Sequence, residues 1–78
     1  MSLYATPSRL TRLRQVDVGN VYREGAEDYA PGHWKVTNQM REMERAGWVK
    51  LESAHPHLLP VWHLTAAGRA VLDAAVTS

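Results

Sequence analysis

The residues best suited to binding chemistry lie in and just before one stretch, residues 36–49, VTNQMREMERAGWV. An asparagine amide can form two hydrogen bonds with adenine, an arginine guanidinium can do so with guanine, and Lys or Arg can hold phosphates. The same pattern is also that of a solvated helix face, whose local ion pairs contribute less than about 0.5 kcal/mol each. The candidates are Lys35, Thr37, Asn38, Arg41 and Arg45.

The spacing of apolar residues predicts that a helix positions these side chains. Val36, Met40 and Met43 are four and three residues apart, so they share one side of a helix, and the candidates Thr37 to Arg45 are expected on the other side. Gly47 can end the helix in a left-handed turn.

An earlier helix is predicted near the N-terminus. Thr6 or Ser8 can cap it, and Pro7 is tolerated in its first turn. Leu10 and Leu13 are three residues apart and are expected to face inward.

Residues 20–36 allow two interpretations. In the first, residues 20–29 form a short helix, which Gly25 weakens by about 1 kcal/mol relative to alanine. In the second, residues 21–23 and 33–36 are two strands joined by the acidic segment between them, and Thr37 caps the central helix.

A β-hairpin and a last helix are predicted after Gly47. Residues 48–53 alternate in polarity, residues 61–64 form a second strand, and the loop between them holds two prolines. Thr65 is expected to cap a helix that ends near residue 76. Gly68 in its first turn indicates close approach of another backbone or side chain, for which the strand that contains Trp62 is the candidate.

Length and composition indicate one small domain, residues 1–78, with no disulfide or thiolate metal site because the chain has no cysteine. The net charge is only +1, but residues 1–23 hold four arginines and one acid, whereas residues 24–34 hold three acids and neither Lys nor Arg. No apolar run reaches the roughly 18 residues of a membrane helix, and no signal sequence is evident. We therefore expect a cytoplasmic protein.

Neither a catalytic site nor a cofactor site is predicted. The chain shows no Gly-rich phosphate loop, no cysteine nucleophile and no paired carboxylates near a histidine. The four histidines at 33, 55, 57 and 63 are expected to be polar surface residues and not metal ligands, since no acid lies in the 54–60 loop. The tryptophans at 34, 48 and 62 could stack on bases, but we assign them to the core.

The stretches MREMERAGWVKLES and VWHLTAAGRAVL together resemble the second half of bacterial winged-helix regulators of the MarR and PadR kind. Met43 four residues before Gly47, and Leu64-Thr65 three residues before Gly68, match that pattern. The resemblance covers about residues 35–73. Those regulators have a second helix before the recognition helix, so the strand interpretation of residues 20–36 would leave the helix-turn-helix incomplete.

The resemblance implies an α+β winged-helix fold and binding of double-stranded DNA in transcriptional control, as a homodimer. The central helix would then enter the major groove, with Asn38 and Arg41 reading bases and Lys35 and Arg45 holding phosphates. The hairpin tip, with His55 and His57, would approach the minor groove or the backbone. The alternative is a winged helix that contacts another protein and not DNA, which the near-neutral charge favours.

Overall fold

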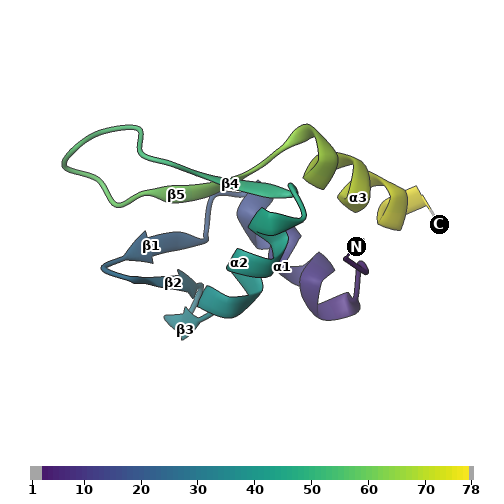
Figure 1. Cartoon of the computed structure of the whole chain (residues 1–78), viewed down its shortest axis with the longest axis horizontal. Coiled ribbons are helices and arrows are strands. Elements are labelled where there is room, and N and C mark those ends of the chain that lie inside the picture. Colours follow the sequence, from purple (N-terminus) through teal and green to yellow (C-terminus); the bar gives the residue numbers. More distant parts are fainter. Residues whose placement is uncertain (1–2, 78) are drawn as a thin grey trace.

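The computed structural model describes residues 3–77, which form an α+β fold of three helices and a five-stranded antiparallel sheet (Figure 1). The strand order is β3-β2-β1-β5-β4, so the β1–β3 meander joins the β4–β5 hairpin through β1 and β5. The β4–β5 loop projects to one side in Figure 1, and α3 extends toward the other. The elements are α1 (Pro7–Asp17), β1 (Tyr22–Glu24), β2 (Glu27–Ala30), β3 (Trp34–Lys35), α2 (Thr37–Arg45), β4 (Val49–Glu52), β5 (Val61–Leu64) and α3 (Ala66–Thr77).

Helix α1 begins as its sequence predicts. Thr6 is the N-cap residue, and its hydroxyl accepts a hydrogen bond from the backbone N–H of Arg9 at 3.3 Å. Pro7 occupies the first turn, where its missing N–H costs nothing. Leu13 and Val16 on the inner side of the helix are buried.

The segment between α1 and α2 is extended, so the helical interpretation of residues 20–29 is wrong. The strand interpretation is confirmed in outline, but the structure adds β2 within the acidic segment that was expected only to connect the two strands. Along β2 the side chains of Asp28 and Ala30 are buried and those of Glu27 and Tyr29 are half-buried, which is the alternation of a strand. The sequence does not show this alternation of polar and apolar residues, because one of the two buried positions holds an aspartate.

Helix α2 packs into the core through the residues that its period predicts. Met40 and Met43 are fully buried, and Gly47 ends the segment at φ 81°, the left-handed conformation predicted for it. The core also includes residues of both strand groups and of α1. Its buried apolar members are Leu13, Val16, Val21, Ala30, Val36, Met40, Met43, Trp48, Val49, Trp62 and Leu72.

The predicted hairpin and C-terminal helix are both present. Strands β4 and β5 pair from Val49 opposite Leu64 to Glu52 opposite Val61. The hydroxyl of Thr65 accepts a hydrogen bond from the N–H of Gly68 at 3.1 Å, as a helix cap does. A Cβ atom on Gly68 would lie 2.0 Å from the carbonyl oxygen of Trp48, so the close approach expected at this glycine is confirmed. The neighbour is the backbone of Trp48, just before β4, and not the strand that contains Trp62.

Among residues 3–77, none of the helices has the length and apolar character needed to cross a lipid bilayer.

Candidate nucleic-acid interface

Three polar side chains form the outer face of α2, which we define as Asn38, Arg41 and Arg45. They are three and four residues apart, and all three are exposed. On the opposite side of the same helix, Met40 and Met43 are fully buried. The core therefore fixes the rotation of α2 about its axis, and this rotation presents the outer face to solvent.

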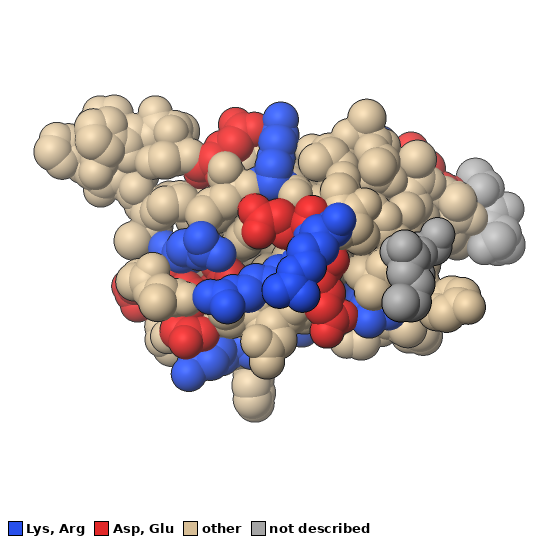
Figure 2. All heavy atoms as spheres, viewed as in Figure 1, with Lys and Arg blue, Asp and Glu red and all other residues tan. Residues whose placement is uncertain are grey.

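Neither cation of this face is held in an ion pair within residues 3–77. In that range the side chains of Arg41 and Arg45, and that of Lys35 just before α2, form neither a hydrogen bond nor an ion pair with another residue. Glu42, on the same helix, instead pairs with Arg9 of α1 at 2.8 Å. In Figure 2, Lys and Arg side chains gather over α2 near the middle of the face in view, with acidic groups among them.

The prediction that Thr37 lies on the exposed side of the helix is wrong. Its side chain is buried. Its hydroxyl accepts a hydrogen bond from the backbone N–H of Asp28 at 2.9 Å and donates one to Glu27. Thr37 is also not the helix cap, since Val36 occupies that position without a side-chain hydrogen bond. Thr37 thus ties the start of α2 to strand β2.

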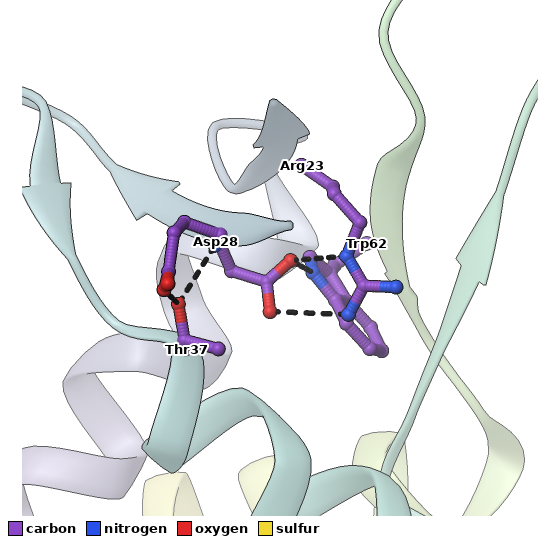
Figure 3. A network of polar contacts seen from close by, with 5 residues as sticks. Arg23, Asp28, Thr37 and Trp62 are labelled. Carbon is purple, nitrogen blue, oxygen red and sulfur yellow. Dashed lines mark hydrogen bonds and ion pairs between the residues drawn. The ribbon is translucent and has the colours of Figure 1, made fainter. Parts of the chain in front are cut away.

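A buried carboxylate holds this junction together (Figure 3). Asp28 has no exposed surface, and its Oδ1 accepts hydrogen bonds from the indole Nε1 of Trp62 and from Nε of Arg23, both at 2.9 Å. Arg23 also lies over the ring of Trp62, with Cζ 5.4 Å from the ring centroid. The hydrogen bond to Asp28 raises the pKa of Arg23, so the guanidinium stays charged. The network joins β1, β2 and β5 directly beneath the first turn of α2.

A polar hollow of about 440 Å³ opens at the start of α2. On one side, Arg12 of α1 donates a hydrogen bond to the side-chain oxygen of Gln39 at 2.8 Å, and burial lowers the pKa of this arginine. The amide nitrogen of Gln39 in turn donates to Ser8 at 3.0 Å, so α1 and α2 are joined through side chains at this hollow. Its lining consists of Arg12, Glu27, Lys35, Val36, Thr37, Asn38 and Gln39.

The tip of the β4–β5 hairpin has a different character. His55 and His57 are exposed, and the backbone N–H of His57 donates to Nδ1 of His55 at 3.2 Å. Leu58 and Leu59 beside them are 63% and 46% exposed. A second hollow of about 530 Å³ lies here, lined by Glu52, Ala54, His57, Leu58, Leu59, Val61 and His63. Within residues 3–77, no three side chains of the metal-binding types come together.

The prediction that Trp34 belongs to the core is also wrong. Trp48 and Trp62 belong to the core as predicted, at 8% and 0% exposure, but Trp34 is 72% exposed. It lies on β3, a strand of two residues at one edge of the sheet. Trp62 lies on the interior strand β5, and Trp48 precedes β4 at the other edge, where α3 approaches it closely at Gly68. The local sequence does not show which edge of the sheet another element covers.

The predicted candidates therefore divide into two groups. Lys35, Asn38, Arg41 and Arg45 lie at or near the outer face of α2, whereas His55 and His57 lie on the tip of the hairpin.

Comparisons of the chain with models of known protein families, with curated proteins and with solved structures returned no match.

Proposed function

We propose that the chain is a winged-helix protein that binds double-stranded DNA in transcriptional control, with α2 as its recognition helix. The observation that carries the proposal is the outer face of α2. It is exposed, it holds two arginines without partners among residues 3–77, and buried methionines on the opposite side fix its direction. A helix with such a face fits the major groove, which is about 12 Å wide.

The order of elements supports the winged-helix assignment. A helix and three strands precede α2, and a two-stranded hairpin and a final helix follow it. Strand β1 pairs with β5 of the hairpin, at Tyr22 opposite Val61, so the hairpin is fixed relative to the recognition helix. The β2 and β3 strands take the place of the usual second helix, so the helix-turn-helix of such regulators is incomplete here, and α2 is supported by the sheet instead of by a helical turn.

The residue types suggest distinct roles on DNA. Asn38 and Arg41 would pair with base edges, preferentially adenine and guanine, and each good pair discriminates by about 1–3 kcal/mol. Lys35 and Arg45 would hold phosphates on either side. His55 and His57 at the hairpin tip would approach the backbone or the minor groove of the neighbouring turn. A homodimer would place two α2 helices on half-sites about 34 Å apart.

The test is fluorescence anisotropy with labelled duplexes selected from a random pool, titrated at two salt concentrations. We expect affinity to fall steeply with salt, because phosphate contacts release counterions. Arg41→Ala should weaken binding to the selected sequence by about 1–3 kcal/mol and relax specificity at one position. Arg45→Ala should weaken binding to all sequences and reduce the salt slope by about 1.

A matched control is Arg14→Ala. Arg14 is an exposed arginine of α1 whose side chain has no partner among residues 3–77, so its removal changes net charge by the same amount as the α2 variants. Equal losses for the Arg14 and Arg41 variants would show that binding depends on overall charge and not on α2.

A second function, contact with another protein through the hairpin, is favoured by the exposed Leu58 and Leu59 and the largely apolar hollow beside them. The same experiments separate the two functions. Absence of duplex binding at about 50 mM salt, where phosphate contacts are strong, together with a stable protein complex that Leu58→Asp abolishes, would support this second function.

A further inference from the structure

Trp34 is a large apolar side chain that the fold leaves mostly exposed. An indole that is 72% exposed leaves most of its apolar surface in water, although two other tryptophans of the chain are almost completely buried. Its indole N–H has no hydrogen-bond partner among residues 3–77. Both the ring and its donor are therefore available to a ligand.

Side-chain contacts anchor the turn that precedes Trp34. The ring of His33 stacks on Tyr29, with centroids 4.0 Å apart, and its Nδ1 shares a hydrogen bond of 3.1 Å with the hydroxyl of Tyr22. The indole lies against Gly32, where a Cβ atom would be 3.1 Å from two ring atoms. The His33 contacts anchor the backbone that carries Trp34, and packing against Gly32 limits the positions of its ring, which lowers the entropy lost on binding.

The position of Trp34 relates it to the outer face of α2. Trp34 lies opposite Ala30, whose side chain is buried, so both point to the sheet face that packs with α2. Trp34 precedes Asn38 by four residues, and four Cα–Cα steps span at most about 15 Å. If Asn38 reads a base in the major groove, which is about 12 Å wide, Trp34 is close enough to reach the sugar–phosphate backbone that borders the groove.

We propose that Trp34 contacts the sugar–phosphate backbone of duplex DNA beside the groove that α2 enters, which rests on the DNA-binding function proposed above. The ring packs on a deoxyribose, and its Nε1–H donates a hydrogen bond to a phosphate oxygen. Stacking on an unpaired base is less well supported. Single-strand platforms use several aromatic rings, whereas Trp48 and Trp62 are buried and Tyr29 is already stacked on His33.

Quenching of tryptophan fluorescence by acrylamide tests the contact directly. Because Trp48 and Trp62 are buried, the quenchable part of the emission comes from Trp34. Saturating duplex should lower the Stern–Volmer slope of the wild-type protein toward that of Trp34→Phe without DNA. A slope that does not change, while anisotropy shows that the duplex is bound, overturns the proposal and leaves the DNA-binding function intact.

The affinity of Trp34→Ala provides the second readout. We expect binding about three- to tenfold weaker, the size of one hydrogen bond and its packing, with an unchanged salt slope because no charge is removed. The matched control is Tyr4→Ala, since Tyr4 is 82% exposed and precedes α1. In Figure 1 the N-terminal end of the chain lies away from β3. Equal affinities for wild type and Trp34→Ala would overturn the proposal.

A duplex with a central unpaired bubble separates the two kinds of contact. The loss caused by Trp34→Ala should be the same on this DNA and on the fully paired duplex. A loss confined to the bubble would show stacking on an unpaired base and would overturn the backbone contact. If wild-type protein binds neither DNA, the function itself fails, and the contact proposed for Trp34 fails with it.

Discussion

At the scale of single residues, Asp28 organises more of the structure than any other polar side chain described above. Its carboxylate is fully buried, and it accepts hydrogen bonds from Arg23 and Trp62, while its backbone N–H bonds to Thr37. A buried carboxylate is tolerated only when charged and neutral donors satisfy it. The donors come from two other strands and the carboxylate from β2, so the group specifies how these strands are arranged.

Removal of this carboxylate should destabilise the fold. Asp28→Ala leaves the indole N–H of Trp62 buried without an acceptor and the guanidinium of Arg23 without its partner, and we expect a loss of about 2–4 kcal/mol. Urea unfolding measures the loss. Glu24→Ala on β1, where the side chain is exposed, is the control and should stay within about 0.5 kcal/mol of wild type. A loss below about 1 kcal/mol for Asp28→Ala would contradict this account of the network.

At the scale of elements, contacts between residues far apart in the sequence determine how the helices pack against the sheet and against each other. Gly68 lets α3 approach the Trp48 carbonyl closely, because any side chain at that position would overlap it. At the first turn of α3, the guanidinium of Arg69 donates two hydrogen bonds to the carboxylate of Asp17 at the end of α1, one of them from Nη1 at 3.2 Å. Helix α3 is thus joined to β4 by backbone contact and to α1 by charge.

The ion pair between α1 and α3 predicts a dependence of stability on pH. The hydrogen bond from Arg69 lowers the pKa of Asp17, so the folded state favours the ionised carboxylate. A depressed pKa in the folded state adds stability above the usual carboxyl pKa of about 3.9, and that stability is lost as the pH falls below it.

We expect the thermal midpoint of the wild type to fall more between pH 7 and pH 3 than that of Asp17→Asn. Circular dichroism at the two pH values measures the difference, and Glu24→Gln, an exposed acid on β1, serves as the control. Identical changes in the wild type and in Asp17→Asn would show that the pair does not stabilise the folded state.

At the scale of the whole molecule, the distribution of charge matters more than its sum. The net charge is +1, and several arginines are neutralised in pairs that hold the fold together, such as Arg9 with Glu42 and Arg23 with Asp28. The cations without partners include those of the outer face of α2. Because these cations are exposed and unpaired within residues 3–77, they remain available to an anionic partner although the net charge of the chain is small.

The hairpin tip is the second region of the molecule that is proposed to contact DNA. His55 and His57 are exposed there, on the projecting hairpin. We expect the double variant His55→Ala, His57→Ala to bind duplex more weakly than the wild type at fixed salt, because polar groups that can reach the DNA are removed. Anisotropy titrations measure both affinities, and equal affinity of the two proteins would contradict a DNA contact by the hairpin tip.

Local signals in the sequence determined much of this protein: the inward methionines of α2, a capped start of α1 at Thr6 or Ser8, the left-handed Gly47, the hairpin and the crowded Gly68. Each depends on periodicity or backbone geometry within a few residues. Only the tertiary structure decided that Glu27–Ala30 is a strand, that Asp28 and Thr37 turn inward, and that Trp34 lies outside the core. Those outcomes depend on packing partners that are distant in the sequence and on which strand lies at an uncovered edge of the sheet. The local sequence contains neither kind of information.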